Sequence, residues 1–219
     1  MHPQANPWRV FLFLSFTMHD MLSIEDNDNK SDHPELRRKL QSGNLILVGM
    51  MGSGKTTMGR AIARHMNKTF ADSDEEIQKR TGVNIPYIFD IEGEPGFRLR
   101  ETSVLYDLVK CDNIVLATGG GVVLAEQNRE LLKQCGIVVY LRASVNDLWH
   151  RTQHDRNRPL LQTADPFGKL MELYQQRDPL YRQVADIAIQ SGKQSVHNLM
   201  MHLVDEIEKF RIAFQTEAK

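Results

Sequence analysis

The sequence predicts an α/β fold in which a five-stranded parallel sheet is flanked by helices on both faces. Five short apolar runs alternate with longer segments whose apolar residues recur every three or four positions. Short continuous apolar runs are typical of strands buried on both faces, and their alternation with helices is typical of a parallel sheet. The first run leads directly into a glycine-rich loop, which marks the expected functional edge of the sheet.

The composition is that of one ordinary globular domain. Of 219 residues, 41% are hydrophobic and 25% are charged, which allows a single well-developed core. The 27 Lys and Arg against 28 Asp and Glu give a net charge of −1, so we expect no nucleic-acid partner. No apolar run approaches the roughly 20 residues of a membrane span. The isolated Cys111 and Cys135 indicate a reducing, cytoplasmic compartment, with both thiols buried.

Residues 1–43 differ from the rest of the chain. The apolar run at 10–16 follows a single Arg9 and precedes no small-residue cleavage site, so it is a poor secretory signal. The polar, acidic stretch at 25–30 is typical of disorder. We therefore expect a dispensable disordered extension over 1–43, with a short helix at 34–41, before a domain over 44–219. A targeting segment, or translation from a later methionine, is the alternative.

The loop after the first expected strand, at 45–48, is typical of phosphate-binding loops. Residues 49–56 fit G-x-x-x-x-G-K-[ST]; the glycines let backbone N–H groups surround phosphate oxygens at a helix N-terminus. Lys55 can lie along the β- and γ-phosphates, and the Thr56 hydroxyl can ligate Mg²⁺. This predicts a three-layer P-loop NTPase fold that binds a nucleoside triphosphate. The expected nucleotide contacts in the loop are Gly49, Gly52, Ser53, Gly54, Lys55, Thr56 and Thr57.

Two carboxylates follow the second expected strand, at 69–71. Asp72 and Asp74 are two residues apart, so they project to the same side beyond the strand. The same sequence is a good N-cap for a helix at 75–80, which Gly82 would end. Both roles are compatible, because one carboxylate can cap the helix while the other reaches the site.

The third expected strand, at 113–117, ends in three consecutive glycines at 119–121. Because ligands of α/β sheets bind beyond the carboxyl ends of strands, these glycines favour a close approach to a ligand over a merely flexible turn. The remaining helices and strands are predicted from apolar periodicity and from the positions of glycine and proline. We expect helices starting at Pro86, at 97–109, at 125–134 and at 145–153, a helix that ends near Asp178-Pro179 and a last helix with its stripe at 196–210; further strands are expected at 137–141 and 187–190.

A polar segment at 154–165 is too long and too charged for a simple connection. It contains Arg156, Arg158 and Pro159, and it is typical of a mobile lid that closes over phosphates, with a solvated loop as the alternative. His150 and His154 are four residues apart, but without a third ligand they predict no metal site.

These motifs, in this order, resemble those of the shikimate kinases, a family among the nucleoside-monophosphate-kinase-like P-loop proteins. The resemblance covers about residue 44 to the C-terminus. It rests on the loop at 49–56, Asp72-Ser73-Asp74, Phe97-Arg98 followed by Glu101, the glycines at 119–121, Arg158-Pro159-Leu160-Leu161 and Arg177-Asp178-Pro179-Leu180-Tyr181.

The resemblance implies ATP- and Mg²⁺-dependent phosphorylation of the 3-hydroxyl of shikimate, giving shikimate 3-phosphate and ADP. This reaction lies on the route through chorismate to the aromatic amino acids, and the resemblance implies a cytoplasmic monomer. It implies catalytic roles for Lys55, Asp74 and Arg158, and a Mg²⁺ site at Thr56 and, through water, Asp72. Further implied contacts are Arg151, Arg158 and Gln194 for ATP; Asp74, Arg98, Gly119, Gly120, Gly121 and Arg177 for the substrate; and Ile85, Phe89, Phe97 and Glu101 around its pocket.

Alternatives share the loop but differ in the acceptor. A gluconate kinase, a nucleoside monophosphate kinase and a nucleotide-binding protein without transfer activity all fit the P-loop alone. Arg98 and Arg177 together with Asp74 favour shikimate over these acceptors, because arginine's planar fork suits a carboxylate. The turn Ser191-Gly192-Lys193-Gln194 departs from the arginine-rich adenine contact that is frequent in the family.

Overall fold

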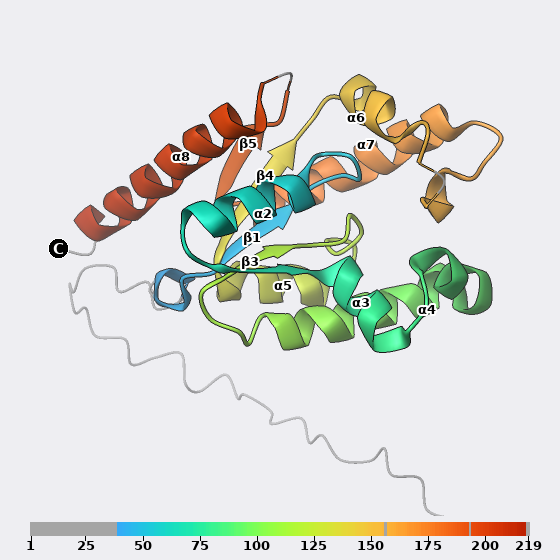
Figure 1. The fold of residues 1–219 in the computed structure, drawn as a ribbon, viewed down its shortest axis with the longest axis horizontal. Helices are drawn as coiled ribbons and strands as arrows, with labels where there is room; N and C mark the ends of the chain where they lie inside the picture. Colours follow the sequence, from blue (N-terminus) through green and yellow to red (C-terminus); the bar gives the residue numbers. More distant parts are fainter. Residues whose placement is uncertain (1–38, 156, 193, 218–219) are drawn as a thin grey trace, which may run out of the picture. The chain divides into compact units, whose positions relative to one another are not determined.

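The computed structural model describes residues 39–155, 157–192 and 194–217, and in this part of the chain five parallel strands form one sheet (Figure 1). The expected extension lies outside the described residues as far as residue 38. The strand order β2-β3-β1-β4-β5 places β1 in the centre and confirms the predicted fold class. The strands are β1 (Leu45–Val48), β2 (Thr69–Asp72), β3 (Ile114–Ala117), β4 (Ile137–Arg142) and β5 (Ile187–Gln190).

Successive residues of the central strand β1 enter different cores, as the two-residue repeat of a strand requires. Ile46 and Val48 pack in a cluster with α4, α5 and α7, whereas Leu45 and Leu47 pack in a second cluster with α2 and α8. Figure 1 shows α2 and α8 on one side of the sheet and α4 and α5 on the other. The helices are α2 (Lys55–His65), α3 (Ser73–Thr81), α4 (Ile85–Leu108), α5 (Glu126–Cys135), α6 (Val145–Thr152), α7 (Pro166–Val184) and α8 (Val196–Glu217).

Helix α4 begins earlier than a helix at 97–109 would. It starts at Ile85, next to the expected Pro86, and continues through a kink at Gly93, where φ is 67° and ψ is −178°. A side chain rarely adopts that backbone conformation, so glycine permits the kink. Pro95 follows at the start of the second half, where its missing N–H is tolerated. Gly93 therefore separates the two halves of α4, and the expected helix at 97–109 lies in the second half.

Helix α7 does not end near Asp178-Pro179, so that prediction is wrong. The helix runs through Pro179 to Val184, although an internal proline costs about 3 kcal/mol. Tertiary packing outweighs this cost, because Tyr181 is fully buried and the Asp178 carboxylate accepts a hydrogen bond from Tyr140 Oη at 2.7 Å. Burial of the last turn therefore overrides the local signal of the proline.

Lys39, the first residue that the structure describes, already contacts the domain. Residues 39–42 are helical, and Lys39 Nζ lies 2.7 and 2.8 Å from the two carboxylate oxygens of Asp186. Asn44 Nδ2 donates to the carbonyls of Cys111 and Cys135, and its Oδ1 accepts from Ile114 N. Residues just before β1 thus connect the segments at the amino-terminal ends of β3, β4 and β5.

Two further expectations concern burial and membranes. The cysteines are not the buried residues that the sequence predicts: Cys111, in the connection between α4 and β3, is exposed, and Cys135, the last residue of α5, is half-buried. None of the helices in the described ranges combines the length and apolar character that crossing a bilayer requires.

Candidate active site

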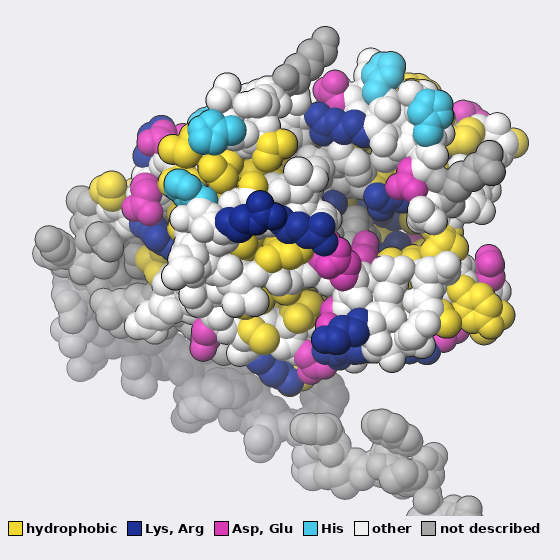
Figure 2. All heavy atoms as spheres, viewed as in Figure 1, with side chains coloured by type: hydrophobic (Ala, Val, Ile, Leu, Met, Phe, Trp, Pro, Cys, Tyr) yellow, Lys and Arg dark blue, Asp and Glu magenta, His cyan; other side chains and the backbone are white. Residues whose placement is uncertain are grey.

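The candidate site lies at the carboxyl ends of the central strands. The P-loop joins β1 to α2, the three glycines follow β3, and α3, α4 and α7 contribute side chains from around them. In Figure 2 the molecular face is hollowed to the right of centre, and basic and acidic side chains are visible in the hollow. The sheet therefore gathers residues that are far apart in the sequence.

The P-loop has the backbone conformation that its glycines were expected to supply. Gly49, Gly52 and Gly54 have φ values of 145°, 78° and 96°, a range that favours glycine. A Cβ at Gly49 would lie 2.6 Å from the Leu141 carbonyl oxygen, and one at Gly52 would lie 2.7 Å from Thr152 Cγ2. Both positions therefore require glycine for space as well as for backbone geometry.

Lys55 lies at the start of α2 and is buried within the P-loop. Its Nζ donates to the carbonyls of Gly49 at 2.8 Å and Met50 at 3.0 Å. Burial lowers the pKa of Lys55 to about 8, although the charge of Asp74 opposes this shift. Two carbonyls thus hold the ammonium where phosphate oxygens could replace them as acceptors.

A single carboxylate performs the two roles that the sequence divided between two residues. Asp72 Oδ1 accepts from Asp74 N at 3.0 Å and caps α3, while Asp72 Oδ2 accepts from Thr56 Oγ1 at 2.8 Å. A hydroxyl and a carboxylate are the hard oxygen ligands that Mg²⁺ prefers, and phosphates and water complete such sites.

Within the described ranges no cluster of three His, Cys, Asp or Glu could hold a metal, so His150 and His154 form none there.

Because Asp72 makes both of those contacts, the Asp74 carboxylate remains available to a ligand. Burial, together with the charges of Asp72 and Glu101, raises the pKa of the Asp74 carboxyl to about 6, while Lys55 opposes the shift. Its Oδ1 atom is buried and accepts no hydrogen bond from the described residues. An unpartnered buried carboxylate oxygen is costly, and a ligand hydroxyl would satisfy it.

Two cavities meet at this carboxylate. The first spans about 490 Å³ and the second about 820 Å³, open solvent included, and the second follows the P-loop. Met51, Asp74, Gly120 and Arg158 line both, so these residues lie where the contents of the two cavities would meet. The smaller cavity is also lined by Ile85, Phe89, Phe97, Arg98, Glu101, Gly119, Gly121, Asn157, Pro159, Leu160 and Arg177, and the larger also by Gly52, Gly54, Lys55, Thr56, Thr57, Asp72, Thr118 and Arg151.

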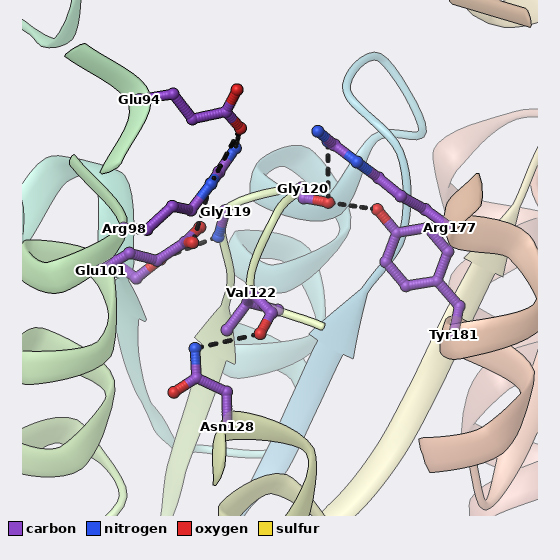
Figure 3. A network of polar contacts seen from close by, with 10 residues as sticks. Glu94, Arg98, Glu101, Gly119, Gly120, Val122, Asn128, Arg177 and Tyr181 are labelled. Carbon is purple, nitrogen blue, oxygen red and sulfur yellow. Dashed lines mark hydrogen bonds and ion pairs between the residues drawn. The ribbon is translucent and has the colours of Figure 1, made fainter. Parts of the chain in front are cut away.

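Arg98 and the glycines of 119–121 pack tightly (Figure 3). Arg98 donates to Glu94 and to Glu101, whose side chain is only 1% exposed. A Cβ at Gly121 would collide with the Arg98 guanidinium, and one at Gly119 would collide with the Glu101 carboxylate. The glycines therefore make room for charged side chains of the protein itself, in addition to any ligand.

Arg177 faces Arg98 from the opposite side of Gly120, as Figure 3 shows. It is 1% exposed; its Nη1 donates to the Gly120 carbonyl at 3.2 Å, and its buried Nε has no acceptor among the described residues. Burial lowers the pKa of the Arg177 guanidinium below its ordinary value. The site thus holds a buried cation with an unused donor, which suits an anionic ligand.

Tyr181 is a site residue to which sequence reasoning gave no role. Its hydroxyl donates to the Gly120 carbonyl at 2.5 Å, and its ring stacks on Tyr140 with centroids 5.0 Å apart. Tyr181 follows Arg177 by four residues, so both side chains leave the same face of α7. That spacing is the signal that could have identified it.

The segment at 154–165, which the sequence predicts to be a lid, contains the short 3-10 helix η1 (Pro159–Leu161). Arg158 precedes it and donates from Nε to Asp155 Oδ2 at 2.9 Å, while it lines both cavities. Arg151 donates to the carbonyls of Gly52, Ser191 and Gly192, so it joins the P-loop to the turn after β5. Gln194 is not among the residues lining the two cavities, and Arg156 and Lys193 lie outside the described residues.

A P-loop cavity that meets a second cavity lined by arginines and a carboxylate defines a P-loop kinase of a small molecule. Comparison with known families then specifies which one. The family model described as shikimate kinase matches residues 51–208, and the chain belongs to the shikimate kinase family.

Relatives agree with this assignment. A shikimate kinase of Nitrosospira multiformis is 60% identical over 166 residues, covering 76% of this chain and 85% of that protein. One of Burkholderia lata is 58% identical over 165 residues, covering 75% and 90%. Among solved structures, the Acinetobacter baumannii shikimate kinase in complex with shikimate is 49% identical, with a TM-score of 0.75 over 76% of this chain and 93% of that one.

The likeness to a gluconokinase of Sinorhizobium meliloti is weaker. It has 17% identity and a TM-score of 0.50, with 80% of this chain and 97% of that chain covered. At this level the likeness concerns the fold alone, so it carries no argument for gluconate as the acceptor.

Proposed function

We propose that this enzyme transfers the γ-phosphoryl group of ATP to the 3-hydroxyl of shikimate, giving shikimate 3-phosphate and ADP. Membership of the shikimate kinase family supports the reaction as a whole. The observation that carries the residue roles is the meeting of the two cavities at Asp74 and Arg158. In that arrangement the P-loop cavity takes ATP and the smaller cavity takes shikimate.

On the nucleotide side, the P-loop N–H groups and Lys55 neutralise the phosphates. Lys55 Nζ exchanges its two carbonyl acceptors for β- and γ-phosphate oxygens, which are stronger acceptors because they are charged. Thr56 and, through water, Asp72 would hold Mg²⁺, which would supply positive charge beside the transferring group. Arg151 contacts the nucleotide from beside the P-loop, and Gln194 approaches the adenine from the turn after β5.

On the acceptor side, Arg98 and Arg177 bind the carboxylate of shikimate. The unused Nε of Arg177 supports this role, since a charged acceptor would satisfy a buried donor. Gly119, Gly120 and Gly121 approach the substrate with their backbone. Asp74 accepts a hydrogen bond from the attacking hydroxyl; with its pKa at about 6, Asp74 is largely ionised at neutral pH and basic enough to receive a proton.

Arg158 completes the site from the lid. Its position on both cavities supports a role at the transferring phosphoryl group, where its charge and the exclusion of water favour transfer over hydrolysis. We further propose that the enzyme works as a cytoplasmic monomer, as the resemblance implies. Light scattering of the purified protein and cell fractionation test these two points.

A coupled ADP-release assay tests the proposed acceptor. We expect ADP release that depends on shikimate, with far lower rates for quinate, gluconate and the common nucleoside monophosphates. Rapid release with gluconate or with a nucleoside monophosphate would identify one of the alternative kinases. ATP binding with no acceptor-dependent release would identify a nucleotide-binding protein without transfer activity.

A further inference from the structure

The guanidinium of Arg98 is already surrounded by carboxylates of the protein (Figure 3). Glu94 Oε1 accepts from Arg98 Nε at 3.1 Å and from Nη2 at 2.7 Å, and Glu101 Oε2 accepts from Nη1 at 2.8 Å. All three nitrogen atoms of the guanidinium therefore donate to glutamates. A substrate carboxylate that reaches Arg98 meets a cation whose charge is shared with two anions.

The two glutamates are not equivalent. Glu101 is 1% exposed and is wedged against Gly119, so it is a fixed partner of Arg98. The Glu94 side chain is 41% exposed and lies on the first turn after the kink at Gly93. Water can solvate a carboxylate at that position, so Glu94 can leave Arg98 at little cost.

The charge of Glu94 also acts beyond its own ion pair. It opposes the lowering of the Arg177 pKa by burial, and it adds to the raising of the Glu101 pKa. Glu94 therefore lies close enough to Arg177 and to Glu101 for its charge to act on both. A further carboxylate between Arg98 and Arg177 is repelled by Glu94 unless Glu94 turns away.

We propose that Glu94 competes with the substrate carboxylate for Arg98 and thereby lowers the affinity of the site for shikimate. This inference rests on the proposed function, in which Arg98 and Arg177 bind that carboxylate. Binding has to displace Glu94 or to tolerate its repulsion, and either one weakens the complex. The product keeps the same carboxylate, so Glu94 also promotes product release.

Glu94→Gln tests the proposal, with Glu92→Gln as the matched control. Glutamine keeps the size of the side chain and an oxygen that can accept from Arg98, but it removes the charge. Glu92 lies on the same helix but pairs with Arg100, at 2.6 and 2.8 Å, instead of with Arg98. The effect of a half-exposed pair predicts about two- to fivefold tighter shikimate binding in Glu94→Gln and no change in Glu92→Gln, measured by calorimetry.

The methyl ester of shikimate separates competition from a general effect on folding. The ester lacks the negative charge, so its affinity should be the same in Glu94→Gln and in the unmodified enzyme. Equal or weaker shikimate binding by Glu94→Gln would overturn the competition, as would an equal gain for the ester.

Arg98→Ala distinguishes this inference from the function on which it rests. A tenfold or greater loss of shikimate affinity in Arg98→Ala, without a gain in Glu94→Gln, rejects the competition alone and leaves the carboxylate site in place. Unchanged affinity in Arg98→Ala rejects both the carboxylate site and the competition.

Discussion

The Tyr181 hydroxyl donates to the carbonyl of Gly120 at 2.5 Å, and Arg177 of the same helix donates to that carbonyl at 3.2 Å. One backbone oxygen of the glycine loop is thus held by two side chains of α7. The loop that lines both cavities is thereby fixed to a helix rather than left flexible.

Tyr181→Phe should loosen this attachment. Loss of one buried hydrogen bond should reduce the free energy of unfolding by about 1 kcal/mol, and greater freedom of Gly120 should weaken shikimate binding. Urea unfolding and shikimate titration measure the two effects. Tyr106→Phe is a suitable control because Tyr106 is 54% exposed and lines neither cavity. Full shikimate affinity in Tyr181→Phe would show that the attachment is unnecessary for binding.

Lys55→Ala should abolish turnover while the protein remains folded. The ammonium is the buried cation of the P-loop, and alanine cannot neutralise charge on the transferring group. Turnover is measured by ADP release and the fold by circular dichroism. A folded variant with near-normal turnover would remove Lys55 from the catalytic residues.

Arg177→Ala and Arg158→Ala should lose different functions. A charge-assisted hydrogen bond is worth roughly 1.5–3 kcal/mol, so Arg177→Ala should weaken shikimate binding about ten- to a hundredfold and leave ATP binding nearly unchanged. Arg158→Ala should lose much more in turnover than in shikimate affinity. Calorimetry and steady-state kinetics on both variants make the comparison, and matching losses in the two would place Arg158 in the acceptor pocket.

Asp74→Asn should lower turnover and raise the free energy of unfolding. The folded pKa of Asp74, about 6, lies above its ordinary value of 3.8, so ionisation of this carboxyl destabilises the folded protein as pH rises through 6. Asparagine should therefore raise the free energy of unfolding at pH 8, on the order of 1–3 kcal/mol, with a smaller gain near pH 5. Turnover should fall strongly, and its decline below pH 6 in the unmodified enzyme should disappear. A pH-independent stability difference would contradict the assignment.

Shortened chains should separate the extension from the domain. A chain starting at Ser31 keeps Lys39 and should retain its stability and turnover. A chain starting at Asn44 leaves Asp186 without its cation, and loss of a mostly buried ion-pair partner costs roughly 3–5 kcal/mol. Thermal unfolding and ADP release compare the two. If the shorter chain is as stable as the longer one, the Lys39 pair contributes nothing.

The sequence was most informative where local chemistry decides the structure. Apolar runs located the strands, and the glycines, Lys55 and Thr56 located the P-loop, because these features need particular residue types at fixed spacing. Packing that involves distant residues was not predictable. The continuation of α7 past Pro179 is accompanied by a contact of Asp178 with Tyr140, far away in the sequence. Asp72 both caps α3 and contacts Thr56, and this leaves Asp74 for the site.

The attachment of Gly120 to two residues of α7 restricts changes in the length of α7 between those two residues. Arg177 and Tyr181 are four residues apart, and one residue of an α-helix corresponds to a rotation of about 100°. A single insertion or deletion between them would turn Tyr181 away from the carbonyl that Arg177 contacts. Changes in length should therefore be rejected between residues 177 and 181.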